Sequence, residues 1–197
     1  MLASITPLGE RGRNNRFAST ATAYVVGAAL GGLTLGALAG GLGWLLGPSG
    51  PLSVVLVAIV ALAAVAADLS LGGLRLLTVR RQVNEDWLTA YRGWVYGLGF
   101  GFQLGLGVVT IVTTAAVYAA VADAVLTGSV LGGVLIGLTF GLVRGLMVFL
   151  GVRVHRPEQL TRMHRAFATR ARAASHLTVV VEALIVCAAA TVLLGAS

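Results

Sequence analysis

Three ionisable side chains lie inside long apolar stretches of the sequence: Asp68, Arg144 and Glu182. A charged side chain at the centre of a bilayer costs about 2.5–3.5 kcal/mol even on lenient insertion scales, so such residues tend to face a bundle interior and pair. We therefore expect Arg144 to form an intramembrane charge network with Asp68, Glu182 or both. The functional interpretation is a gate or an ion- or proton-coupling site. The structural interpretation is a pair that fixes helix register, or side chains that reach back to the cytoplasmic interface.

A second set of polar side chains follows the apolar stretch 93–121. In a helix, Tyr96, Gln103, Thr110 and Thr114 would share one side of this stretch, with Gln103 near the middle of the membrane. This pattern predicts the lining of a solute pathway. The alternative is hydrogen bonding between helices, which contributes only about 0.6 kcal/mol per bond on average.

Other kinds of chemistry find little support. The three histidines, at 155, 164 and 176, have neither tight spacing nor a cysteine or carboxylate cluster beside them, so no metal site is expected. The Gly-x-Gly-x-Gly run at 97–101 is not followed by Gly-Lys-Ser/Thr and lies in an apolar stretch, so it is not a nucleotide loop. No nucleophile-elbow pentapeptide or His-Glu-x-x-His motif occurs. We expect no enzyme activity and no cofactor.

The elements that must position these residues are hydrophobic helices. The chain of 197 residues is 57% hydrophobic and 11% charged, whereas soluble domains average about 25% charged. About 20 apolar residues suffice to cross the hydrocarbon core of a bilayer. The sequence predicts an all-α integral membrane bundle with five transmembrane helices and two basic amphipathic cytoplasmic connections, in a single domain 1–197. The predicted spans cover about 21–46, 52–71, 93–121, 130–152 and 173–194.

Glycines recur at helical spacing in these spans. Small residues allow two helix backbones to approach closely in lipid, so glycines on one side of a helix predict a packing face. The strongest such series has a glycine at every fourth position of 130–152, and a similar series occurs in 93–121. The predicted packing residues are Gly97, Gly101, Gly105, Gly133, Gly137, Gly141 and Gly145.

The arginines predict the topology. Three lie in a short lead, 1–20, four in 75–92 and six in 153–172, while the loops 47–51 and 123–129 have none. By the positive-inside rule the N-terminus is cytoplasmic and the C-terminus is outside, in the inner (plasma) membrane of a bacterium. Basic connections of this kind can hold anionic lipid headgroups. The placement of the arginines beside apolar spans argues against nucleic acid as a partner.

The glycine-rich spans with their basic cytoplasmic connections resemble small bacterial transporters and the membrane domain of the DsbD/CcdA thiol-transfer proteins. The second resemblance covers only the glycine-rich character of 97–107. Electron transfer in the thiol-transfer family depends on a cysteine pair, and Cys187 is the only cysteine in this sequence. The resemblance therefore does not imply that activity.

Two classes of function fit the sequence. One is a transporter-like protein that moves a small solute or ion, completed by homo-oligomerisation or by a partner membrane protein. The other is a non-catalytic scaffold or assembly subunit that docks a partner protein through glycine-rich helix faces. A water-lined cavity reaching Gln103 or Arg144 would favour the first, and a dry bundle with an exposed glycine stripe would favour the second.

Overall fold

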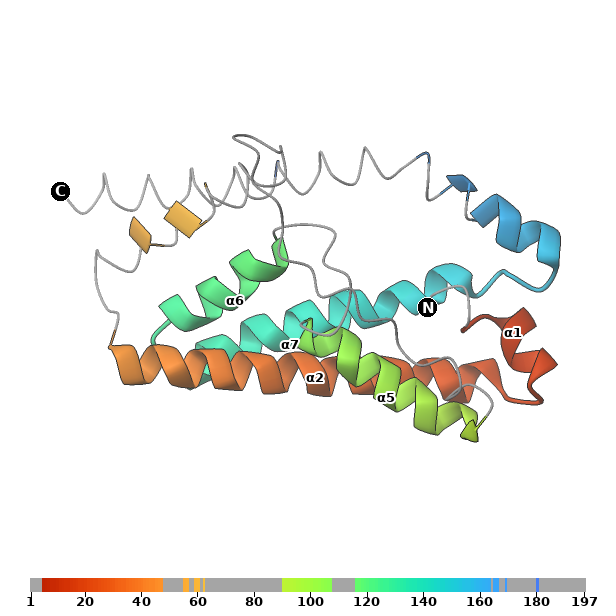
Figure 1. Ribbon diagram of the computed structural model, residues 1–197, viewed down its shortest axis with the longest axis horizontal. Helices are drawn as coiled ribbons and strands as arrows, with labels where there is room; N and C mark the ends of the chain where they lie inside the picture. The colour runs from red at the N-terminus through yellow and green to blue at the C-terminus, as the bar shows by residue number, and fades with distance from the viewer. Residues whose placement is uncertain are drawn as a thin grey trace. The chain divides into compact units, whose positions relative to one another are not determined.

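The computed structural model describes residues 5–47, 90–107 and 116–163, together with positions 55, 56, 59, 60, 62, 165, 166, 169 and 180 (Figure 1). All regular structure in these residues is helical, in agreement with the predicted all-α class. The predicted spans 52–71 and 173–194 fall almost entirely outside the described residues.

The N-terminal lead contains a short helix, α1 (Pro7–Gly12). The Thr6 side chain caps it by accepting a hydrogen bond from the Gly9 N–H at 3.2 Å, and Pro7 occupies the first turn. Both features favour helix initiation, because the first turn has N–H groups without helical acceptors and proline lacks that donor. The lead is thus a folded part of the protein as well as a basic segment.

Two helices among the described residues are long and apolar enough to cross a bilayer. The first is α2 (Phe17–Leu46), which starts four residues before the predicted span. The second is α7 (Val130–Leu146), which continues into the 3₁₀ helix η2 (Met147–Gly151). Both helices expose large apolar side chains, including Leu38, Leu45 and Leu131. Such a surface suits contact with lipid, since lipid-facing helices have no need of a polar outer side.

The continuous helix predicted over 93–121 is not observed. Helix α5 (Gly93–Leu106) ends at Gly107, whose φ of 68° lies in the left-handed region, and α6 (Ala116–Leu126) follows further along the chain. Glycine adopts this conformation without the steric penalty of a Cβ atom and commonly terminates helices. The 14 residues of α5 extend about 21 Å, less than the ~30 Å of a bilayer core.

The chain forms two compact units. The first comprises Met1–Leu33, Arg80–Thr110 and Leu138–Arg170. Within it, α5 runs parallel to α2, because Gly97 faces Thr20 whereas Gly105 faces Ala28 and Gly32 (Figure 1). Three glycines of α5 lie against the backbone of α2: Gly97, Gly101 and Gly105. A Cβ atom on any of them would collide with that backbone.

In the same unit, the end of α7 packs against α2 through Gly141 and Gly145, which face Ala28 and Val25. The core between these helices is aromatic and aliphatic, and its buried members are Ile5, Ala21, Tyr24, Tyr96, Phe100 and Val148.

The second unit comprises Thr34–Val79, Ile111–Gly137 and Ala171–Ser197. Here the later part of α2 meets the start of α7, with Gly133 against Gly36 and Gly40, and the Cα atom of Gly137 next to Gly36. In both units, therefore, the glycines predicted to form packing faces lie against α2.

Candidate functional site

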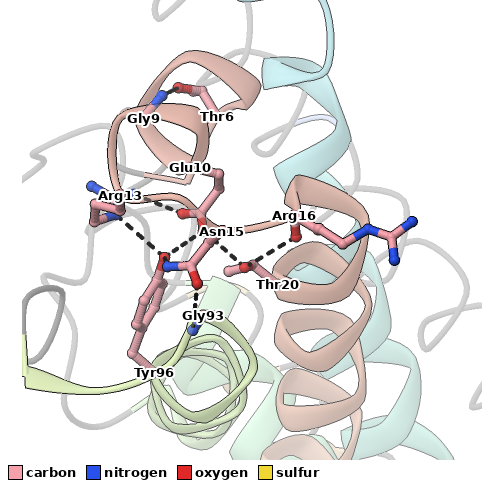
Figure 2. Close-up of polar contacts among 9 residues, drawn as sticks. All are labelled: Thr6, Gly9, Glu10, Arg13, Asn15, Arg16, Thr20, Gly93 and Tyr96. Carbon is pink, nitrogen blue, oxygen red and sulfur yellow. Dashed lines mark hydrogen bonds and ion pairs between the residues drawn. The ribbon is translucent and has the colours of Figure 1, made fainter.

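The most concentrated polar cluster among the described residues surrounds Glu10 of α1 (Figure 2). The Glu10 side chain is completely buried. Its Oε2 atom accepts hydrogen bonds from the Tyr96 hydroxyl at 2.5 Å and the Thr20 hydroxyl at 2.9 Å. Its Oε1 atom forms an ion pair with the Arg13 guanidinium at 2.6 Å. A buried carboxylate is stable only when its oxygens are satisfied, and both oxygens here have charge-assisted or hydroxyl donors.

Arg13 and Asn15 extend the cluster toward α5. The Arg13 Nε–H donates to the Tyr96 hydroxyl at 3.3 Å, and its guanidinium lies 5.7 Å from the centre of the Tyr96 ring. The Asn15 side chain donates to the same hydroxyl at 3.4 Å and accepts from the Gly93 N–H at 3.4 Å. Burial alone would lower the pKa of Arg13, but hydrogen bonds to Glu10 and Tyr96 outweigh it and raise that pKa. The guanidinium therefore stays charged opposite Glu10.

The donors come from three parts of the chain, so the cluster fastens the N-terminal segment to the starts of two helices. Thr20 belongs to α2, Tyr96 to α5 and Arg13 to the turn after α1. A further contact joins α1 to the segment after η2, because the Leu8 N–H donates to the Val154 carbonyl at 3.1 Å. With its carboxylate enclosed and both oxygens occupied, the cluster is suited to holding elements together rather than to receiving a substrate.

Sequence reasoning missed Glu10 because it lies among arginines in a segment without apolar periodicity. The one usable signal was the pair Thr6-Pro7, a typical helix start that places Glu10 within the first turn of α1. Nothing in the residue spacing indicates that this turn folds back onto Tyr96, which lies 86 residues further along the chain.

The structure describes Tyr96 and Gln103 of the predicted pathway lining. Tyr96 is fully buried in the Glu10 cluster, and Gln103 is half-buried in the last turn of α5. Thr110 and Thr114 lie outside the described residues. The Tyr96 hydroxyl is bonded to Glu10 and so is not free to line a pathway. The predicted solute pathway therefore depends on Gln103, Thr110 and Thr114.

Arg144 is half-buried on α7, where its guanidinium carbon lies 5.1 Å from the centre of the Phe140 ring. A cation over an aromatic face is attracted by the electrons of the ring. Asp68 and Glu182, its predicted partners, lie outside the described residues, so the charge network stays a prediction. No group of three or more histidine, cysteine, aspartate or glutamate side chains gathers as a metal site in the described part of the chain.

Comparison with known proteins shows a partial similarity to a curated protein. No protein-family profile and no solved structure matches the chain. The methylamine utilization protein MauF of Methylophilus methylotrophus is 32% identical over 115 residues, which is 56% of this chain and 40% of MauF. Because the chain spans 40% of the length of MauF, this similarity by itself does not transfer the activity of the whole protein.

Proposed function

We propose that the chain is a multi-pass protein of a bacterial inner membrane that moves a small solute or ion. The observation that carries this proposal is the end of α5 at Gly107, within the uncharged stretch 93–121. Non-helical backbone at membrane depth is tolerated where it is buried in protein or lines a water-filled cavity. Transporters commonly build their binding sites from such discontinuous helices.

The residues beside this break suit a polar or cationic solute. Gln103 lies in the last turn of α5, and Thr110 and Thr114 follow the break in sequence. The carbonyl end of a helix carries partial negative charge, and helix ends of this kind coordinate cations in transporters. The Gly107 N–H is engaged by the Leu104 carbonyl at 3.1 Å. The remaining carbonyls of the last turn of α5 have no N–H donor further along the helix and point beyond its C-terminal end, where a cation could bind.

The predicted topology has support in the first unit. Because α2 and α5 run parallel, their arginine-bearing starts, at Arg16 and Arg92, lie on one side. Helix α7 runs antiparallel to α2, and the segment after it bonds to α1, so Arg153 approaches the same side. A common basic side favours a cytoplasmic N-terminus. Even the five spans that the sequence predicts would be few for a transport pathway, so the proposal includes a second copy or a partner membrane protein that completes it.

Substituted-cysteine labelling tests the pathway without knowledge of the solute. Gln103→Cys, made in a Cys187→Ser background, should react with a small water-soluble thiol reagent in intact membranes, because a transport pathway admits water to this position. Leu38→Cys, on an exposed apolar part of α2, is the control and should react slowly. If Gln103→Cys reacts no faster than Leu38→Cys, the transport proposal is wrong.

The name of MauF associates that protein with methylamine utilization, which makes labelled methylammonium the first solute to test. Purified protein in liposomes should give saturable uptake that empty liposomes lack. Gly107→Ala should lower this uptake severalfold, because a Cβ atom penalises the left-handed conformation by about 1–2 kcal/mol. Gly47→Ala, at the end of α2 with a φ of 65°, is the matched control and should retain uptake.

The scaffold hypothesis is less well supported by the packing. Its docking faces were the glycine stripes, and within the described residues these stripes are covered by α2 of the same chain. A scaffold would therefore have to use another surface.

A further inference from the structure

An open groove with a volume of about 610 Å³ lies along the first turns of α2 and α5, within the first compact unit. Arg16, Ser19 and Thr22 line one part of it, and Trp94 lies on the α5 side. The remaining lining is apolar and includes Val26 and Leu98. This groove is separate from the Glu10 cluster, since Figure 2 shows the Arg16 guanidinium pointing away from the Glu10 carboxylate.

The groove changes from polar to apolar along the helix axis. At 1.5 Å rise per residue, Val26 lies about 15 Å beyond Arg16 along α2. On α5, Leu98 lies one turn after Trp94. Because the two helices run parallel, the polar ends on both sides coincide. Tryptophan is enriched at the membrane–water interface, which fits the position of Trp94 beside the basic end.

The Arg16 side chain is exposed and available to a ligand. Its backbone carbonyl accepts from Thr20, but no carboxylate among the described residues pairs with its guanidinium. The two hydroxyls beside it, of Ser19 and Thr22, are also exposed and follow at the spacing of one helix side. Together they offer a positive charge and two hydrogen-bond donors to an anion that has an apolar tail.

We propose that this groove binds one anionic phospholipid. Its phosphate lies against Arg16, Ser19 and Thr22, its glycerol lies level with Trp94, and an acyl chain follows Val26 and Leu98. The charge complementarity and the polar-to-apolar direction of the groove select a lipid over a water-soluble anion or a peptide. The inference rests on the membrane location proposed above but not on transport, and it concerns a surface different from the basic connections 75–92 and 153–172.

The test is lipid retention by the whole chain, purified in detergent and measured by native mass spectrometry. Dioleoyl phosphatidylglycerol should be retained better than dioleoyl phosphatidylcholine. Arg16→Gln should weaken phosphatidylglycerol retention about fivefold, the effect of one arginine at a membrane surface. Arg11→Gln is the matched control, because Arg11 is exposed in the same basic segment and does not line the groove. This control should retain the lipid.

A second variant tests the groove by shape. Thr22→Trp fills the polar end without changing charge and should reduce retention of phosphatidylglycerol. If thermal unfolding shows that Arg16→Gln does not fold, lipid retention by Thr22→Trp decides whether the groove is the binding site. Equal losses in Arg16→Gln and Arg11→Gln would overturn the site in favour of general surface charge. Protection of the unfolding midpoint by glycerol phosphate equal to that by phosphatidylglycerol would overturn the lipid assignment.

Discussion

The Glu10 side chain makes several of the contacts that hold the N-terminal segment in place, because it bonds to Thr20 and Tyr96 and pairs with Arg13. Glu10→Gln keeps the shape of the side chain but removes its charge and one acceptor. One of the three donors around it must then lose its partner, and Arg13, whose side chain is 23% exposed, loses its counter-charge. We expect the free energy of unfolding to fall by about 2 kcal/mol, the usual range for a hydrogen bond to a charged group.

This prediction is checked by unfolding the purified protein in detergent. Glu158→Gln is the control, because Glu158 is exposed. Comparable midpoints for the two variants would show that the Glu10 cluster contributes nothing to stability. Tyr96→Phe combined with Glu10→Gln should cost less than the sum of the two single changes, since both alter the hydrogen bond between these two side chains.

The partly buried Asp123 side chain should make the stability of the protein depend on pH. This side chain lies in α6 beyond the predicted span, and its Oδ1 atom is buried without a hydrogen-bond partner among the described residues. Burial raises its pKa above the ordinary value of 3.8. A carboxyl whose pKa is raised on folding stabilises the fold below the unfolded pKa, and that stability is lost as pH rises through the folded pKa.

Asp123→Asn should therefore raise the unfolding midpoint at pH 7, and its advantage over the wild-type chain should disappear as the pH falls toward 3.8. The measurement is a series of thermal unfolding curves from pH 7 downward in one detergent. An advantage that stays constant with pH would instead reflect a cause unrelated to ionisation.

At the scale of the helices, two glycines of α2 differ in their surroundings. A Cβ atom at Gly31 would collide with the Phe102 carbonyl of α5, whereas nothing lies within 4 Å of one at Gly41. Gly31→Ala should lower stability by about 1–3 kcal/mol through overpacking. Gly41→Ala should leave stability unchanged or raise it by up to about 1 kcal/mol, because alanine is the better helix former.

Both variants can be compared by the same unfolding measurement, and each serves as a control for the other because they share one helix. If Gly31→Ala were as stable as Gly41→Ala, the close approach of α2 and α5 would not be essential to the fold.

The sequence pattern predicted the extent of α2 and α7 to within a few residues, because apolar length is a strong signal. It did not predict the end of α5 at Gly107, since a glycine that packs against a neighbouring helix and a glycine that ends a helix look alike in the sequence. The same limit applies to the site. Tyr96 was singled out as polar in an apolar stretch, but its partner Glu10 is distant in sequence and no local pattern joins the two.

At the scale of the whole molecule, the topology can be tested at two described positions. In a Cys187→Ser background, Thr127→Cys in the loop before α7 should react with an impermeant thiol reagent from outside intact cells. Arg153→Cys should react only after the membrane is permeabilised, since it follows α7 on the basic side. Both residues are exposed. Labelling of both from outside would contradict the assigned sides.

The hydrogen bond between Tyr96 and Glu10 also has a consequence for biosynthesis. The two residues are 86 positions apart, so at about 5–20 residues per second Tyr96 is made roughly 4–17 s after Glu10. Val154, whose carbonyl accepts a hydrogen bond from the Leu8 N–H, is synthesised later still. During that interval the Glu10 carboxylate must stay hydrated, while α2 is already available for insertion. The docking of α1 is thus a late event, which can occur only after α5 has been synthesised beside α2.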